Sequence, residues 1–290
     1  MSAFLFKSLS VLFFVLMGTC IKLLADRIPL FEVVFFRNFF ALFPVLFMLW
    51  KYNLKLSEIN QYHLHLMRAA FGICAMTLFF LSLRHVHLVE MQTLSFSSVF
   101  FISILSVFFL HEVIGMKRII AIMFGFIGVV IILNPSTSIF SNYSLLPLIA
   151  SLFLSFAVIC LKKILITNNN FLSIFIFTLF CSIISLAFFN SSWVVPNTSD
   201  FILLTLTGIF GFIAQVFLTK SYQLADASLL APFEFSSLLW SYFIGYFLFN
   251  EVVSLRVYIG GLLVVLSVSY IFYRERTLKK RVVLGVNKQF

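Results

Sequence analysis

The chain consists largely of uninterrupted apolar runs of about 18 residues or more, and these runs limit what it can fold into. A helix of ~20 apolar residues crosses the hydrocarbon core of a bilayer. A transmembrane β-barrel would instead show segments of ~10 residues with alternating polarity. Hydrophobic residues make up 62% of the chain and charged residues only 10%, a balance that a soluble core of this length does not accommodate. The sequence therefore predicts an all-α integral membrane protein.

Turn-forming stretches separate ten such runs. They include "ADRIP", "NPSTS", "TNNN" and "WVVPNTSD". The connections are short, and no soluble domain fits between the runs. Residues 276–290 form a short basic tail. We expect transmembrane helices over residues 3–24, 31–50, 64–83, 88–110, 117–134, 143–163, 171–190, 201–221, 226–249 and 254–273.

Lysine and arginine predict the orientation, because they are retained on the cytoplasmic side of a membrane. With the N-terminus in the cytoplasm, fifteen of the twenty Lys and Arg residues fall on the inner side. Only Arg27, Arg84 and Arg256 fall on the outer side, while Lys22 and Arg37 lie within spans. We therefore expect a multi-pass protein of the bacterial inner (plasma) membrane with both termini in the cytoplasm.

The two halves of the chain resemble each other at a nearly constant offset. "SFSSVFFISILSVFFLHEV" (95–113) aligns with "EFSSLLWSYFIGYFLFNEV" (234–252), and this places Glu112 opposite Glu251. Each of these glutamates closes the fourth helix of its half, and we interpret them as paired structural brackets for the following turn.

A second alignment supports the repeat. "SVLFFVLMGTCIK" (10–22) aligns with "ASLFLSFAVICLK" (150–162), so that the last residues of the two segments, Lys22 and Lys162, correspond. A unit of five helices inserts its second copy upside down, and inverted repeats of this kind are typical of secondary transporters. We expect one repeat at residues 1–134 and the other at 143–275.

These units resemble the EamA-type carriers of the drug/metabolite transporter superfamily, since each ends its fourth helix in "FFLHEV" or "FLFNEV" before a Gly-containing fifth helix. "FEVVFFRNFFA" (31–41), "HLMRAAFG" (65–72) and "ADASLLAPFEFSSLLWSYFIGYFLFNE" (225–251) are most similar to the S-adenosylmethionine uptake carriers of intracellular bacteria. Those carriers have a proline near "SFSS", where this chain has Val99, and tend to have a basic residue where it has Glu234.

Glu234 lies inside an apolar run, about eight residues or ~12 Å into the expected ninth helix. Pro232 removes a backbone donor just before it and should kink the helix. A carboxylate near the midplane of a kinked helix is typical of a substrate or coupling site, where it binds a cation or exchanges a proton. The same helix face carries Ser237, Ser241 and Gly245. Alternatively, these small residues only let helices pack closely.

The matching face of the fourth helix is also polar, and two facing polar stripes would line a cavity between the repeats. Phe96 and Phe235 occupy matched positions beside these stripes and are candidate aromatic walls. The candidate substrate-binding residues are Glu234, Arg37, Gln92, Ser95, Ser98, Gln215, Ser237, Ser241, Phe96 and Phe235.

Arg37 lies about six residues into the second helix, whose outer end carries Glu32. Its guanidinium can bind a substrate carboxylate, pair with an acid in the outer gate, or snorkel to the interface. Arg68 lies near the cytoplasmic end of its helix. Its side chain can either snorkel to the interface or have a functional role, and the sequence does not distinguish the two. The candidate gate or coupling residues are Glu234, Arg37, Glu32 and Arg68.

The sequence points to a transporter and not to an enzyme. It has no phosphate-binding Gly-rich loop, nucleophile elbow or zinc-binding pair. His85, His87 and Glu90 have a spacing that permits metal binding, but a solvated loop is the simpler interpretation. We expect a secondary carrier that moves a small polar, cationic or zwitterionic metabolite, such as S-adenosylmethionine, by alternating access.

Two alternatives stay open: an exporter of amino acids or drugs with the same fold, and a membrane-embedded lipid-modifying enzyme. We expect no metal, no cofactor and no nucleic acid partner. The expected partners are the substrate and the lipid bilayer; a coupled proton, a counter-substrate and a second copy of the chain are further candidates.

Overall fold

The computed structural model describes residues 2–110, 116–133, 142–164, 169–187, 193–224 and 236–286. The described residues form helices joined by short connections, with two 3-10 turns, η1 (Leu56–Glu58) and η2 (Asn142–Ser144). The α-helices are α1 (Ser2–Leu24), α2 (Leu30–Lys51), α3 (Tyr62–Leu83), α4 (Leu88–Ser95), α5 (Ser97–Leu110), α6 (Met116–Leu133), α7 (Leu145–Ile164), α8 (Asn170–Leu186), α9 (Thr198–Leu224), α11 (Ser236–Phe249) and α12 (Leu255–Val286).

The prediction of an all-α membrane protein with ten spans is confirmed, because α4 and α5 together form one span. Five described stretches are long and apolar enough to cross a bilayer: Leu5–Leu24, Leu30–Lys51, Tyr62–Leu83, Leu88–Leu105 and Thr198–Leu218. Large apolar side chains such as those of Phe108 and Phe247 are exposed on the outside of the bundle. Such exposure is expected where lipid is the solvent.

Two helix boundaries differ from the sequence prediction. The fourth span is not one continuous helix over 88–110 but is interrupted at Phe96. The last helix does not end at residue 273 but continues through the basic tail to Val286. The tail contains no proline or glycine before Gly285 that would end the helix, so the helix extends past the apolar segment. Residues 225–235, including the first part of the predicted ninth span, lie outside the described residues.

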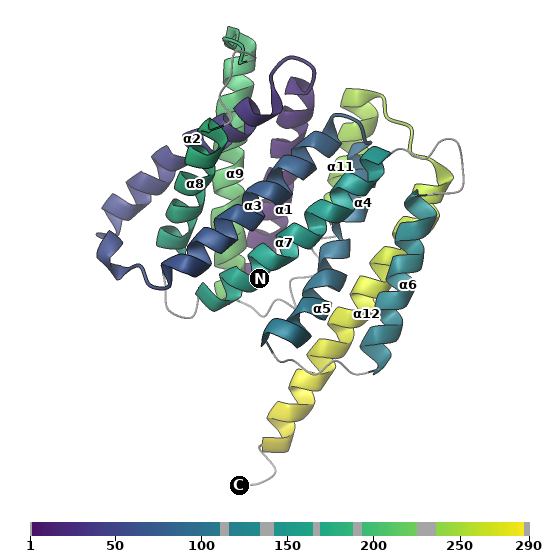
Figure 1. Cartoon of the computed structure of the whole chain (residues 1–290). Coiled ribbons are helices and arrows are strands. Elements are labelled where there is room, and N and C mark those ends of the chain that lie inside the picture. Colours follow the sequence, from purple (N-terminus) through teal and green to yellow (C-terminus); the bar gives the residue numbers. More distant parts are fainter. Residues whose placement is uncertain are drawn as a thin grey trace.

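The helix pairs have the symmetry of an inverted repeat. Helix α1 packs on α9, and its counterpart α7 packs on α3. The equivalent helices α2 and α8 pack on each other, as do α6 and α12. Within each of these two pairs the helices run in opposite directions (Figure 1). The start of α1 and the end of α12 both lie toward the lower side of the bundle (Figure 1).

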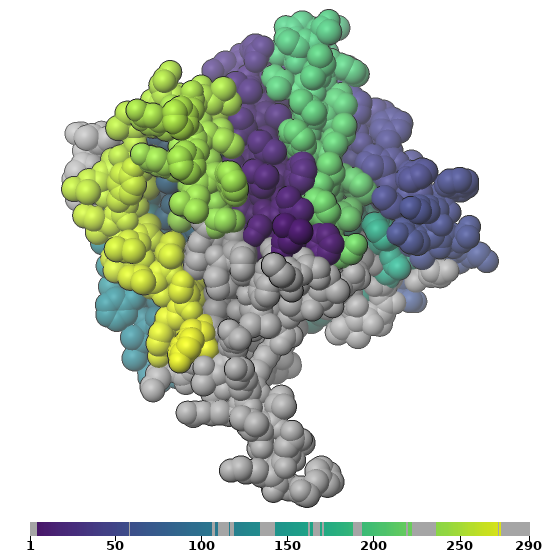
Figure 2. Space-filling view, turned by 180° about the vertical axis from the view of Figure 1, so that it is seen from behind, coloured from purple at the N-terminus to yellow at the C-terminus, as the bar shows by residue number. Residues whose placement is uncertain are grey.

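The helices can be divided into two groups, which meet along α11 on one side and along α4 and α5 on the other. Helices α1, α2, α3, α7, α8 and α9 form a six-helix group, and α4, α5, α6, α11 and α12 form a second group. One buried apolar cluster of the second group joins Phe100, Ile132 and Val264. The groups touch where α1 lies beside α11, where α7 lies beside α5 and α4, and where α3 lies beside α4. Figure 2 shows α11 and α12 on one side of α1 and α9 on the other.

Candidate functional site

The interruption at Phe96 results from a tightening of the backbone. The amide of Phe96 donates to Thr93 O at 3.3 Å, and the amide of Val99 donates to Phe96 O at 3.0 Å. Such bonds over three residues form a 3-10 turn, which within a long helix often marks a functional hinge. No proline is needed for this interruption, since residue 99 is valine. The predicted aromatic wall Phe96 is buried, 6% exposed, in the apolar cluster of the second group.

Serine side chains of the opposite repeat lie beside the backbone at this interruption. Ser151 Oγ of α7 lies 3.2 Å from Ser95 O, and Ser155 Oγ lies 3.1 Å from Ser98 O. The shorter hydrogen bonds of these hydroxyls, 2.7 Å and 2.6 Å, go to Pro147 O and Ser151 O of their own helix. Irregular backbone at membrane depth is tolerated only where protein groups or water satisfy it. Sequence reasoning predicted Ser95 and Ser98 as polar side chains facing a cavity. In the structure their carbonyl oxygens make the contacts between repeats.

The neighbouring candidates of the fourth span are half-buried. Ser95 Oγ donates to Gln92 O at 2.7 Å and lies 3.5 Å from Gln92 Oε1. Ser95, Ser98 and Gln92 are partly accessible, as is Gln215 on α9. These four residues therefore occupy positions from which a polar side chain can reach a substrate, and their substrate-binding role stays a prediction.

The described part of α11 starts at Ser236, which is the repeat equivalent of Ser97, the first residue of α5. On α11 the buried residues are Ser237, Ser241 and Gly245, so the predicted face is the one that turns inward, toward α4 and α1. Among the described residues, Ser237 Oγ and Ser241 Oγ have no hydrogen-bond partner. The candidates Glu234 and Phe235, with Pro232, lie outside the described residues.

Arg37 lies deep in the six-helix group, with only 3% of its surface exposed. Its Nη1 donates to Asn38 Oδ1 at 2.8 Å, and Asn38 Nδ2 donates to Val34 O at 2.7 Å. A Cβ atom at Gly211 of α9 would lie 3.0 Å from Arg37 Nε, so this glycine makes room for the guanidinium. Burial of this kind argues against snorkelling to the interface.

The charge of Arg37 has no acidic partner among the described residues. None of their carboxylates lies within 4.0 Å of it, and Nε has no hydrogen-bond partner among them. A buried uncompensated charge costs several kcal/mol, about 3–5 kcal/mol when the partner of a buried ion pair is removed. An intramembrane charge of this kind marks a functional site by default.

Glu32 does not pair with Arg37. Its carboxylate is buried, and Oε2 accepts a hydrogen bond of 3.1 Å from the amide of Val194. The segment before α9 is thereby attached to the start of α2. On the same side, an ion pair joins Arg27 to Asp200, with 2.7 Å between Nη1 and Oδ1.

Arg68 is buried in α3 and binds α8. Its Nη1 donates to Ser173 O at 3.0 Å and also to Ser173 Oγ. The guanidinium carbon lies 4.9 Å from the centroid of the Phe177 ring, within the range of a cation–π contact. Arg68 thus connects the first repeat to the second, and a carbonyl, a hydroxyl and an aromatic ring of α8 contact its guanidinium.

The contact that sequence reasoning missed joins Lys22 to Glu251, with 2.5 Å between Nζ and Oε1. Lys22 Nζ also donates to Val86 O at 2.8 Å, and Glu251 Oε2 accepts from the Leu88 amide at 2.9 Å. We interpreted Glu251 only as a bracket for its own turn. A sequence signal was present, because Lys22 and Glu251 are both matched across the repeat by residues of the same type, Lys162 and Glu112.

The environment of Glu251 controls its ionisation. Burial raises the pKa of its carboxyl, but the nearby His87, the Lys22 ammonium and the Leu88 amide outweigh burial and hold this pKa at about 2. The proximity of the Glu251 carboxylate in turn raises the pKa of His87 above its ordinary value. His87 Nδ1 lies 3.8 Å from Glu251 Oε2.

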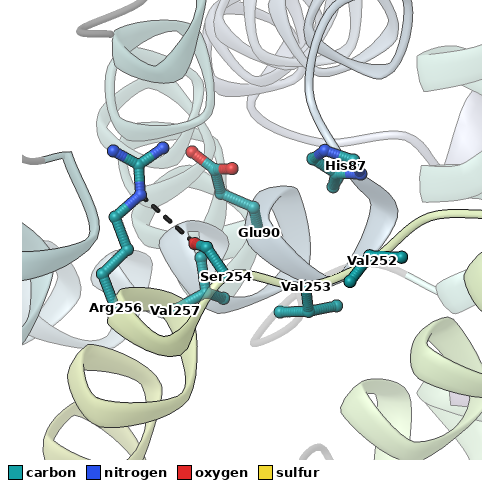
Figure 3. A pocket seen from close by; sticks show the side chains of 7 residues that line it. All are labelled: His87, Glu90, Val252, Val253, Ser254, Arg256 and Val257. Carbon is teal, nitrogen blue, oxygen red and sulfur yellow. Dashed lines mark hydrogen bonds between the residues drawn. The ribbon is translucent and has the colours of Figure 1, made fainter.

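A shallow pocket lies beside this contact, between the start of α4 and the connection from α11 to α12. Figure 3 shows Arg256 and Glu90 on one side of the pocket and His87 on the other. Arg256 Nε donates to Ser254 Oγ at 3.2 Å, and Ser144 Oγ donates to Glu90 Oε1 at 3.0 Å. Within the described part of the chain, no three His, Cys, Asp or Glu residues are grouped so that they could hold a metal ion.

Comparisons with known proteins agree with this geometry. A 30% identical protein of Rickettsia felis, matched over 90% of this chain and 88% of its own length, is named an S-adenosylmethionine uptake transporter. A riboflavin transporter of Vibrio cholerae is 30% identical over 77% of this chain and 75% of its own. The pseudopaline exporter CntI of Pseudomonas aeruginosa is 24% identical, with 88% and 90% covered.

A protein crystal structure superposes with a TM-score of 0.66 over 96% of this chain and 98% of the other, at 15% sequence identity, and so shows a shared fold. The family model described as "EamA-like transporter family" matches twice, at residues 1–134 and 142–273. With one match on each of the two inverted halves, the chain belongs to the EamA-like family of membrane transporters.

Proposed function

We propose that this protein is a secondary carrier that moves a small cationic or zwitterionic metabolite across the inner membrane by alternating access. S-adenosylmethionine is the leading candidate, because the relatives from Rickettsia carry that substrate in their names. Its amino-acid group supplies a carboxylate and its sulfonium supplies an additional positive charge. A carrier for it needs a cation near the carboxylate and an acid or aromatic group near the sulfonium.

The observation that carries the proposal is the buried guanidinium of Arg37. It is 3% exposed and has no acidic partner among the described residues. A substrate carboxylate would offset the cost of this charge and receive the unused Nε–H donor. Gly211 lets the guanidinium pack directly against α9, because a side chain at residue 211 would meet Arg37 Nε at 3.0 Å.

The cationic end of the substrate is assigned to Glu234 on sequence grounds alone. Glu234 follows Pro232 in an apolar segment, and it precedes the buried serine face of α11 by one turn. A carboxylate in lipid is costly unless a positive charge or a proton neutralises it. Glu234 therefore provides either the sulfonium subsite or the site of a coupled proton.

Export by the same fold is the second candidate function, and the similarity to the pseudopaline exporter of Pseudomonas aeruginosa supports it. Pseudopaline export and S-adenosylmethionine uptake differ in direction and in substrate. The fold itself is compatible with both, since inverted repeats make two gates that exchange roles.

Uptake and counterflow in proteoliposomes test these proposals. Radiolabelled S-adenosylmethionine should accumulate and saturate, and unlabelled S-adenosylmethionine should compete better than S-adenosylhomocysteine, which lacks the sulfonium charge. Methionine and riboflavin serve as further competitors. The variant Glu234→Gln should insert but lose uptake. If S-adenosylmethionine shows no saturable movement in either direction but another solute does, the proposed substrate is wrong and the proposal of a carrier still holds.

A further inference from the structure

The ion pair of Lys22 and Glu251 joins the two groups of helices. Lys22 lies in the last turn of α1 in the six-helix group, and Glu251 follows α11 in the second group. Both side chains are largely shielded, with 16% and 6% of their surfaces exposed. The pair lies on the side of the bundle where α1 leads into α2 and α3 leads into α4, which is the upper side in Figure 1. The charge pattern predicts this side to be the outer one.

The backbone after α11 is shaped to present Glu251 to Lys22. Asn250 has a left-handed conformation with φ 52°, which asparagine tolerates better than most residues. The amide of Glu251 then donates to Gly245 O at 2.9 Å, which closes the end of the helix. A Cβ atom at position 245 would lie 2.7 Å from Glu251 Oε2, so the carboxylate occupies space that only glycine leaves.

The pair also holds the start of α4. The Leu88 amide, one of the donors that a helix N-terminus leaves without an intrahelical partner, donates to Glu251 Oε2. Val86 O accepts from Lys22 Nζ. One ion pair therefore connects α1, the segment between α3 and α4, and the segment between α11 and α12.

We propose that Lys22 and Glu251 form the outer latch of this carrier, an ion pair that closes the outer side and separates whenever the carrier opens outward. This inference rests on the alternating-access mechanism proposed above, but it does not depend on the substrate. An ion pair suits a latch because water solvates both charges once they separate. The open state therefore does not have to expose apolar surface at this contact. The two groups of helices then have a closed and an open arrangement, and the ion pair shifts the equilibrium toward the closed one.

The latch covers the buried serine face of α11. Ser241 is fully buried and lies one turn, ~6 Å, from Gly245 along the helix toward the membrane centre. Opening of the contact between α1 and α11 would expose Ser241 to the outside. A cysteine at position 241 therefore reports the state of the latch.

The test measures labelling of Ser241→Cys from outside. The full-length chain, with its four native cysteines replaced, is placed in right-side-out membrane vesicles and treated with a membrane-impermeant maleimide. Glu251→Gln and Lys22→Met keep the side-chain size but remove one charge each. Each should raise the labelling rate roughly tenfold, within the range of a coupling energy between two sites.

The matched control is the ion pair of Arg27 and Asp200, which also joins the two repeats on the same side. It lies within the six-helix group, since it connects the end of α1 to the start of α9. Arg27→Gln and Asp200→Asn should leave the labelling rate of the reporter unchanged. The latch proposal would be wrong if all variants were labelled at the rate of the parent protein, or if the control variants showed the same increase as Glu251→Gln and Lys22→Met.

Cross-linking tests the latch by holding it closed, whereas the charge variants test it by weakening it. Lys22→Cys combined with Glu251→Cys, joined by a short bifunctional thiol reagent, should abolish labelling at position 241 and stop exchange, and cleavage of the linker should restore both. If the cross-linked protein still exchanges substrate at the wild-type rate, the contact between Lys22 and Glu251 stays closed during transport and is not a latch. If labelling responds as expected but S-adenosylmethionine does not move, only the substrate assignment fails.

Discussion

Gly128 of α6 and Gly260 of α12 face each other so closely that a Cβ on either would lie 2.6 Å or 2.5 Å from the carbonyl oxygen of the other. The contact is reciprocal because the two helices are equivalent members of an inverted repeat. Small residues let membrane helices approach closely enough for backbone contact. This pair thus holds the second group of helices together at its centre.

We expect Gly128→Ala and Gly260→Ala to destabilise the protein by about 1–3 kcal/mol each, because backbone atoms obstruct the added methyl group. Thermal unfolding in detergent measures the effect. Gly18→Ala is the control, since its Cβ would meet only Leu83 Cδ1 at 3.8 Å, an ordinary contact. A loss of stability at Gly18 as large as at Gly128 would contradict this explanation.

Replacement of Arg37 should separate function from stability. Arg37→Gln removes a buried charge without an acidic partner among the described residues, so we expect the unfolding midpoint of the substrate-free protein to rise by roughly 2–6 °C. Uptake should fall roughly tenfold or more, since a hydrogen bond to a charged group is lost.

Arg68→Gln is the contrasting variant. Arg68 donates to Ser173 and stacks over Phe177, and its removal should lower the unfolding midpoint. If Arg37→Gln also lowers the midpoint and leaves uptake unchanged, Arg37 is a structural residue.

Gly245→Ala should imitate the loss of the latch. The added methyl group would displace the Glu251 carboxylate, because its nearest neighbour is Oε2 at 2.7 Å. That neighbour is the end of a flexible side chain, so the carboxylate moves while the helix is preserved. We expect faster labelling of Ser241→Cys from outside with little change in thermal stability. An unchanged labelling rate would mean that the carboxylate tolerates the methyl group without leaving Lys22.

The strength of the latch should depend on pH through His87. The nearby Glu251 carboxylate raises the pKa of His87, so the imidazolium supports the latch at low pH and loses its charge as pH rises through this pKa. Glu251, with a pKa of about 2, stays ionised throughout. Lys22 and Glu90 are the other charged groups near His87. We expect labelling at position 241 to increase between about pH 5.5 and 8.

The comparison with His87→Gln isolates this effect, because dividing the two rates at each pH cancels the titration of the reporter thiol. The ratio of the rate in the parent protein to that in His87→Gln should rise with pH. His85→Gln is the matched control, since His85 stacks on Tyr143 at 3.8 Å between ring centroids and makes no ion pair with Glu251. A flat ratio for His87→Gln would exclude the imidazole from the latch.

The repeat makes one further prediction from sequence alone. Glu112 and Lys162 correspond to Glu251 and Lys22, and inverted repeats place equivalent residues toward opposite sides of the membrane. Glu112→Gln should therefore increase labelling of a central reporter from the cytoplasmic side and not from outside. If Glu112→Gln instead increased labelling from outside, as Glu251→Gln should, the two pairs would not be latches on opposite sides of the membrane.

The sequence by itself determined the class of fold, the number of spans and the division into two halves. Hydrocarbon offers no hydrogen bonds to the backbone, so each long apolar run must form a helix regardless of its neighbours. For the same local reason the start of α1, its end near Lys22 and the burial of Ser237 and Ser241 could be predicted. The residues of the repeat then predicted two inverted five-helix units.

Only the tertiary structure decided what the individual polar residues contact. The partners of Lys22 and Arg68 lie more than 100 positions away along the chain, at Glu251 and Ser173, and no local pattern specifies such a distance. Near the interruption at Phe96, Ser151 and Ser155 of α7 lie beside carbonyl oxygens, which any residue type supplies. Gly245 faces the polar interior as the sequence predicts, but it serves to admit a carboxylate from the following turn. Helix periodicity indicates which residues face inward, whereas packing between helices decides which of them meet.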